Sequence, residues 1–323
     1  MGRVSASRVA GAGAWVAAGL CLGWALMRSF GLERGFPLQA VIAWTPFVVW
    51  LALLTCLVAG VLRRWGALAV AAPAAVLLIV AVLPRAFGGG HEPAGADGPG
   101  LRVLSANLAL GQAQAAALLE LVDGGEIDVL CVQELTPESL AALEGAGLGD
   151  RLPHELAGPG ETSHGSAIFS RYPLRELDSV EPPGYPFEMP RAGLRIPGTG
   201  AVEVVSVHPV PPTGPNAVST WEQGLEALPG TGEPGPIRLL VGDFNATLDH
   251  RELREVIDRG YVDAGDATGG GLRPTWPVRV LRPGVTIDHV LADERVAIAE
   301  YDVHELSGSD HRAVSAVLRL PGA

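Results

Sequence analysis

Apolar residues divide the chain at about residue 90. Three long stretches of the first part contain no charged side chain: residues 9–27, 38–62 and 66–83. A helix needs about 20 apolar residues to cross the hydrocarbon core of a bilayer. A cleaved leader has a shorter apolar core and is not followed by two further apolar stretches. The pattern therefore predicts a membrane anchor over residues 1–87 with three transmembrane helices.

Beyond residue 100 the pattern changes to short β-rich runs separated by Gly and Pro turns, with occasional helical periods. Strands are predicted at 101–110, 127–135, 165–174, 192–196, 201–210, 236–247, 286–293 and 311–320, and helices at 112–126, 217–228 and 249–260. The spacing by itself predicts an α/β or α+β domain over residues 101–320. The Gly- and Pro-rich segment 88–100 is typical of a flexible linker.

Charge is distributed as unevenly as hydrophobicity. Sixteen of the 23 basic residues and 34 of the 35 acidic residues lie beyond residue 91, which gives that part a formal charge of −18. Such a surface repels polyanions, and duplex DNA binding depends on neutralising phosphates with Lys and Arg. The composition therefore argues against a protein that tracks DNA. The three cysteines predict no disulfide framework.

Basic residues in short loops indicate how the anchor is oriented. Arg3 and Arg8 precede the first predicted span, and Arg63 and Arg64 follow the second, so these ends are expected in the cytoplasm. With three spans, the amino terminus is then inside and the acidic domain outside the cytoplasm.

Eight polar side chains stand at the ends of apolar runs instead of on a polar surface face: Asn107, Glu134, His208, Asp243, Asn245, Asp288, Asp310 and His311. Strand ends are where side chains from distant parts of a sequence converge. Carboxylate and amide oxygens without cysteine suit Mg²⁺ or Mn²⁺. Two histidines add groups that exchange protons near neutral pH. These residues are the components of a phosphoester hydrolase.

Seven segments, in order, resemble the endonuclease/exonuclease/phosphatase superfamily, which includes DNase I, exonuclease III and neutral sphingomyelinases. They are SANLAL, VLCVQEL, GSAIFSRYPL, VVSVHP, LLVGDFNAT, TWP with TIDHVL, and SGSDHRAV. The resemblance covers residues 101–320 and implies a four-layer α/β sandwich of two mixed sheets. The preceding spans resemble a membrane-anchored bacterial subgroup that includes actinobacterial teicoplanin-resistance proteins.

The resemblance also implies which residues bind the metal. Glu134 resembles the metal-binding glutamate of the family, and Asp310 matches the metal-site aspartate of the final SDH. Asn107 is similar to the asparagine that helps to hold the metal or the phosphate. An Asx turn at the strand end is the structural alternative for Asn107, and a surface ion pair is the alternative for Glu134.

The remaining five site residues receive catalytic roles from the resemblance. Asp243 positions or deprotonates the attacking water, and Asn245 donates its amide to a phosphate oxygen. His208 binds the phosphate or protonates the leaving oxygen, unless it is a structural histidine. His311 is the base or a stabiliser of phosphoryl charge, and Asp288 orients it. By strand alternation His289 faces the other way, so a structural role is expected for it.

These observations predict a membrane-anchored, extracytoplasmic, Mg²⁺-dependent phosphohydrolase. Its partners would be the lipid bilayer and a phosphate-containing substrate, with a lipid-linked cell-wall intermediate such as undecaprenyl pyrophosphate as the specific hypothesis. Two alternatives remain open at this point: an extracellular Mg²⁺-dependent nuclease, and a non-catalytic binding or sensing module on the same fold.

Overall fold

The computed structural model describes residues 2–182, 184–278 and 283–322, and side chains from residue 9 onward. The chain divides into two compact units. The first contains Met1–Pro84 with Leu248–Arg251, and the second contains Arg85–Thr247 with Glu252–Ala323.

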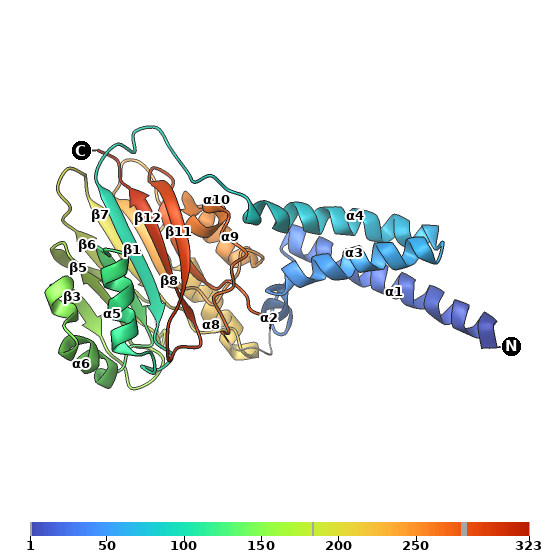
Figure 1. Cartoon of the computed structure of the whole chain (residues 1–323), viewed down its shortest axis with the longest axis horizontal. Helices are drawn as coiled ribbons and strands as arrows, with labels where there is room; N and C mark the ends of the chain where they lie inside the picture. The colour runs from blue at the N-terminus through green and yellow to red at the C-terminus, as the bar shows by residue number, and fades with distance from the viewer. Residues whose placement is uncertain (1, 183, 279–282, 323) are drawn as a thin grey trace. The chain divides into compact units, whose positions relative to one another are not determined.

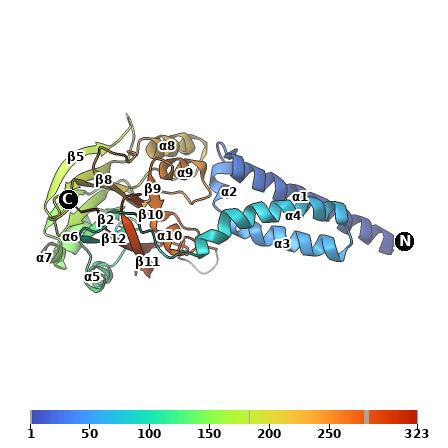
Figure 2. The same cartoon turned by 90° about the horizontal axis from the view of Figure 1, so that it is seen from above.

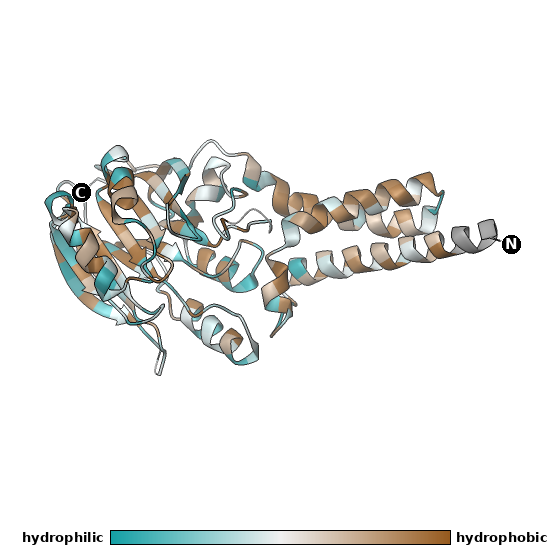
Figure 3. Ribbon diagram, turned by 60° about the horizontal axis from the view of Figure 1, so that its bottom comes forward, coloured by the Kyte–Doolittle hydropathy of each residue, from teal (hydrophilic) through white to brown (hydrophobic). Residues whose placement is uncertain are grey.

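The first unit is helical. Its elements are α1 (Gly2–Phe30), α2 (Leu38–Ile42), α3 (Thr45–Val61) and α4 (Trp65–Val82). Helices α1, α3 and α4 pack against one another (Figure 2). Fully buried alanines, among them Ala18, Ala52 and Ala71, lie where these helices meet, whereas Trp15 and Trp50 are exposed. Small residues inside and large apolar residues outside are the arrangement of helices packed in lipid, and Figure 3 shows apolar colouring along all three.

Two of the three predicted spans are long and apolar enough to cross a membrane, within Val9–Phe30 and Trp65–Ala86. The predicted span 38–62 is not one helix. Helix α2 ends at Ile42, and α3, an apolar helix of 17 residues, begins at Thr45. Pro46 stands in the first turn of α3, where its missing N–H removes no helical hydrogen bond. A new helix therefore starts there, and the prediction of one continuous helix was wrong.

The second unit contains two six-stranded sheets. The order in the first is β11 (Ala297–Glu305), β12 (Arg312–Arg319), β1 (Gly100–Asn107), β2 (Val129–Gln133), β4 (Ser166–Ser170) and β3 (His154–Gly158). The order in the second is β5 (Leu174–Val180), β6 (Met189–Leu194), β7 (Val202–Val207), β8 (Ile237–Asp243), β10 (Asp288–Asp293) and β9 (Tyr261–Asp263). Each sheet has one parallel pair, β1–β2 and β7–β8, so both are mixed.

The two sheets face each other across an apolar core that contains Val103, Cys131, Val204, Leu239 and Val290. A second core lies on the outer face of the first sheet, under α5 (Ala115–Gly124), α6 (Pro137–Gly145) and α7 (Leu148–Arg151). Helix α8 (Pro215–Glu226) lies on the opposite side of the sheets from α5 (Figures 1 and 2). Two short helices, α9 (Arg251–Ile257) and α10 (Ala264–Thr268), complete the fold. The α/β fold with two mixed sheets is therefore confirmed.

The eight predicted strands are the eight interior strands of the two sheets, and the four strands that the pattern missed are the edges: β3, β5, β9 and β11. An edge strand has one neighbour and is half-solvated, so it needs fewer apolar residues. In β11, for example, the sequence AIAEYDVHE carries four acidic or imidazole side chains. The apolar pattern therefore identified the interior strands of each sheet and missed the edge strands.

The predicted linker 88–100 is hydrogen-bonded along the second unit. Gly90 donates its N–H to the Ala267 carbonyl at 3.0 Å, and His91 forms a β-bridge with Ile298. Gly98 donates to the Leu320 carbonyl at 2.9 Å, two residues before β1 begins. This segment is packed at these points, in contrast to the free tether that its composition predicts.

Candidate active site

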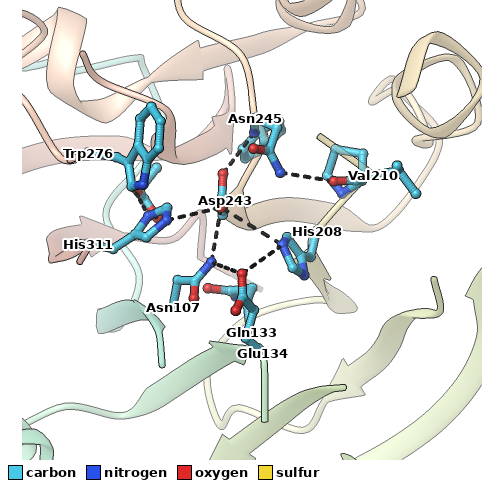
Figure 4. Close-up of polar contacts among 12 residues, drawn as sticks. Asn107, Gln133, Glu134, His208, Val210, Asp243, Asn245, Trp276 and His311 are labelled. Atoms are coloured by element: carbon cyan, nitrogen blue, oxygen red, sulfur yellow. Dashed lines mark hydrogen bonds and ion pairs between the residues drawn. The ribbon is translucent and has the colours of Figure 1, made fainter. Parts of the chain in front are cut away.

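All eight predicted site residues lie at or beside strand ends of the second unit. Figure 4 shows five of them around Asp243: Asn107, Glu134, His208, Asn245 and His311. The Asn107 amide donates to Asp243 Oδ2 at 3.0 Å and to Glu134 Oε1 at 3.2 Å. His208 Nε2 lies 3.9 Å from both of these carboxylates, and His311 Nε2 lies 3.8 Å from Asp243. Side chains separated by more than 200 residues of sequence therefore meet around one carboxylate.

Glu134 is held in a left-handed backbone conformation, with a φ of 55°. Its Oε2 accepts the Leu110 N–H at 2.8 Å, while Asn107 contacts Oε1. Asn245 is also left-handed, with a φ of 48°, and its N–H donates to Asp243 Oδ1 at 2.8 Å. Such conformations cost of order 1–3 kcal/mol for residues other than glycine and concentrate at functional sites. Hydrogen bonds to neighbouring site residues hold both turns in place.

His311 is fixed from both sides. Its Nδ1 lies 3.0 Å from Asp288 Oδ2, and its backbone N–H donates to Ser309 Oγ. The adjacent Asp310 accepts the indole N–H of Trp276 at 3.1 Å, and the Trp276 ring also lies beside the His311 ring. Trp276 is half-buried and joins the site through Asp310.

Burial and neighbouring charges separate the pKa values in this cluster. Burial, and then the charge of Asp288, raise the pKa of Asp243 to about 7. Burial alone would lower the pKa of His311, but the carboxylates of Asp288 and Asp243 raise it to about 10. Burial and the nearby His311 lower the pKa of His208 to about 3. At neutral pH His311 is therefore protonated and His208 is neutral.

Glycine is required at position 242, directly before Asp243. A Cβ there would lie 2.0 Å from the Val207 carbonyl oxygen and 2.7 Å from the Val207 nitrogen. The backbones come this close because Gly242 pairs with Val207 where β7 and β8 run parallel. This pairing brings Asp243, at the end of β8, next to His208, at the end of β7.

A buried polar bridge that the sequence did not reveal connects the two sheets beneath the site. Gln133 accepts from Ser105 Oγ at 3.2 Å and donates to Ser206 Oγ at 3.1 Å, and all three side chains are buried. Because Gln133 immediately precedes Glu134, the bridge fixes the end of β2 against β7. A motif consisting of one glutamine and two distant serines carries no signal in a single sequence.

The donor set fits a hard divalent cation, since the carboxylates converge and no thiolate is present among them. The Glu134 carboxylate remains 18% exposed. The Asn107 amide oxygen accepts the Ala109 N–H at 2.9 Å. Asn107 could therefore bind a metal through this oxygen only if its hydrogen bond with the Ala109 N–H were broken. Asp243, Asp288 and His311 place three potential ligand atoms within 4.8 Å of one another. The short Asp288–His311 contact and the raised pKa of His311 favour a carboxylate–imidazolium pair for these residues over a metal cage.

The family model described as the endonuclease/exonuclease/phosphatase family matches residues 104–311, about two thirds of the chain. The chain therefore belongs to this family, and the matched range contains all eight site residues. No curated protein matches the sequence.

Solved structures show the same fold. An endonuclease/exonuclease/phosphatase from Beutenbergia cavernae is 20% identical, with a TM-score of 0.55 over 69% of this chain and 72% of that one. TDP2 from D. rerio, in complex with a single-strand DNA product, is 16% identical, with a TM-score of 0.53 over 68% and 98%. The 3′-5′ exonuclease NExo from Neisseria meningitidis is 18% identical, with a TM-score of 0.50 over 67% and 98%.

Proposed function

We propose that the chain is a membrane-anchored, metal-dependent phosphohydrolase whose catalytic domain lies outside the cytoplasm. The observation that carries this proposal is the cluster at Asp243, where two carboxylates, two imidazoles, the Asn107 amide and the Asn245 backbone N–H converge within hydrogen-bond or ion-pair distance. Family membership supports hydrolysis of a phosphoester or pyrophosphate. The apolar helices support anchoring in the bilayer.

The residues suggest a division of roles during attack of water on phosphorus. Asp243, whose pKa of about 7 lies near the working pH, takes the proton from the water. Asn107 holds the Asp243 carboxylate in place. The protonated His311, supported by Asp288, stabilises negative charge on the phosphoryl oxygens as the bond to the leaving oxygen breaks. This division makes His311 the charge stabiliser and not the base.

Asn245 and His208 bind the phosphoryl group in this proposal. One N–H of the Asn245 amide donates to the Pro209 carbonyl at 3.0 Å, which leaves the second for a phosphate oxygen. His208, neutral at pH 7, contributes a hydrogen bond instead of a proton. Glu134 and Asp310 would hold Mg²⁺, with Asn107 beside them. A bound Mg²⁺ would supply Lewis-acid polarisation of the phosphoryl group.

A lipid-linked phosphoester or pyrophosphate is the proposed substrate, with a cell-wall intermediate such as undecaprenyl pyrophosphate as the specific case. The anchor would bring the site to a membrane surface, and the charge of −18 disfavours polyanionic nucleic acid. An extracellular nuclease is the second candidate. The likeness to TDP2 with single-strand DNA supports the fold that a nuclease would use, at 16% identity.

The test uses the full-length chain in detergent micelles, because Leu248–Arg251 clusters with the helical unit and truncation would expose it. Hydrolysis of undecaprenyl pyrophosphate, plasmid DNA and a sphingomyelin-like diester is measured with Mg²⁺ and with chelator. We expect Mg²⁺-dependent release of phosphate from the lipid, and its loss in His311→Ala. Activity that persists in chelator would refute the metal-dependent mechanism. Preference for DNA would establish the nuclease, and no hydrolysis of any substrate would favour a binding module.

A further inference from the structure

His289 follows Asp288 on β10 but faces away from Asp243, and it is 2% exposed. Its Nδ1 lies 2.7 Å from Asp263 Oδ2, and its Nε2 lies 2.9 Å from the Ala246 carbonyl oxygen. A carboxylate and a carbonyl oxygen are both acceptors, so the ring donates a proton to each. Burial alone would lower the pKa of His289, but the Asp263 charge and both hydrogen bonds raise it.

The Ala246 carbonyl belongs to the turn that carries Asp243 and Asn245. The turn is held at its middle by Phe244, which donates its N–H to Ile287 and accepts the Trp221 indole N–H. The Phe244 ring also packs edge-on against His289, with centroids 5.6 Å apart. Ala246 immediately follows the left-handed Asn245, so its hydrogen bond to His289 restrains the far end of the turn.

Asp263 is itself fixed at the end of β9. It is 4% exposed, and its Oδ1 accepts the Asp266 N–H at 2.7 Å as the N-cap of α10. The Ala246 carbonyl is therefore connected through His289 and Asp263 to α10, the helix that directly follows β9. Strand β9 is the neighbour of β10 in the sheet. Each group in this chain is buried and hydrogen-bonded, which favours a single geometry.

We propose that His289, supported by Asp263, is a positioning residue that fixes Asn245 for catalysis by holding the Ala246 carbonyl. This inference rests on the proposed function of the same site and adds two residues to it. His289 does not touch the substrate. It acts on the reaction through the geometry of the turn.

The first test compares His289→Phe with Leu118→Ala in the full-length chain, using the substrate that the wild-type chain hydrolyses. His289→Phe keeps a ring against Phe244 and removes both donors, whereas Leu118→Ala opens a cavity under α5, away from the site. Displacing a catalytic group by about 1 Å costs up to about 10²-fold in rate. We therefore expect His289→Phe to lower kcat by about tenfold or more with little change in KM, and Leu118→Ala to leave kcat unchanged where both variants are folded.

A double variant separates positioning from a general loss of stability. If His289 acts through Asn245, adding His289→Phe to Asn245→Ala lowers kcat by less than about twofold further, because the amide to be positioned is already gone. Additive losses would overturn the proposal. Asp263→Asn is the conservative rescue, since its amide can donate to Nδ1 while Nε2 still donates to Ala246. It is expected to retain most of the activity that Asp263→Ala loses.

A readout without substrate keeps this inference separate from the proposed function. Amide hydrogen exchange of residues 243–247 is measured in the same variants. We expect faster exchange in His289→Phe and wild-type exchange in Leu118→Ala. Unchanged exchange in His289→Phe would refute the restraint of the turn. Absence of hydrolysis by the wild-type chain, together with faster exchange in His289→Phe, would refute the proposed function alone.

Discussion

At the scale of single residues, the candidate site pairs an acid and a base whose surroundings shift their pKa values far from the ordinary ones. Asp243 is buried next to a second carboxylate, so its neutral form is favoured. His311 lies between carboxylates, so its charged form is favoured. Glu134 and Asn245, which belong to the same cluster, have left-handed backbone conformations that reduce stability.

The first prediction concerns pH. Below about pH 7 Asp243 carries a proton and cannot accept one from water, so we expect kcat/KM to rise through about pH 7. Above about pH 10 His311 loses the charge that stabilises the phosphoryl oxygens, so the rate falls again. Initial rates between these limits measure the profile. An acidic limb near pH 4, the ordinary range of a carboxyl group, would contradict the raised pKa of Asp243.

At the scale of elements, the parallel pairs bring the site together. Strands β1 and β2 deliver Asn107 and Glu134 to one edge, and β7 and β8 deliver His208 and Asp243. The carboxyl ends of parallel strands meet at the same edge of a sheet, so four residues from distant segments become neighbours. The close approach at Gly242 sets the distance between the second pair.

The second prediction tests that approach. Gly242→Ala forces β8 away from Val207, since its Cβ would lie 2.0 Å from the carbonyl oxygen. Overpacking of this kind costs about 1–3 kcal/mol of unfolding free energy, and kcat should fall with it because Asp243 moves relative to His208. The matched control is Gly200→Ala, an exposed position with open space around its Cβ. Denaturant unfolding and initial rates are compared, and equal behaviour of the two variants would contradict the proposed packing role.

At the scale of the whole molecule, the proposed anchor implies a topology: if its helices cross a membrane, the number of spans decides on which side the second unit lies. Three spans with the amino terminus inside place it outside, whereas two spans return it to the cytoplasm. Whether α3 crosses the bilayer decides between three spans and two. Its 17 residues extend roughly 25 Å, at the lower limit for a hydrocarbon core of about 30 Å. Its outward side chains Trp50, Leu57 and Val61 are exposed and apolar, which favours contact with lipid.

The third prediction follows from this count. With three spans, alkaline phosphatase fused after residue 34, 88 or 323 is active, because these positions lie outside the cytoplasm, and a fusion after residue 64 is inactive. A green fluorescent reporter at the same positions should give the opposite pattern and controls for expression. Activity after residue 64 would show that α3 does not cross or that the orientation is reversed. Activity after residue 34 distinguishes between these two outcomes, because it is kept when α3 does not cross and lost when the orientation is reversed.

The sequence by itself determined the long apolar segments, the eight interior strands and which eight residues are candidates for the site. These depend on local apolar runs and on motifs such as GDFN and SDH, which a linear pattern records. The pattern did not predict the edge strands, because half-solvated strands need few apolar residues. It did not predict the helix break at Ala43–Trp44, because the residues on both sides of the break are apolar.

Only the tertiary structure decided the protonation states of these residues and the hydrogen bonds between them. The raised pKa of Asp243, the protonated state of His311 and the neutral state of His208 depend on burial and on charges brought together from four strands. The Gln133 bridge and the contact of His289 with Ala246 join residues 73 and 43 positions apart. Sequence specifies which groups are present, whereas hydrogen bonds and electrostatic shifts depend on distances that exist only once the two sheets have packed.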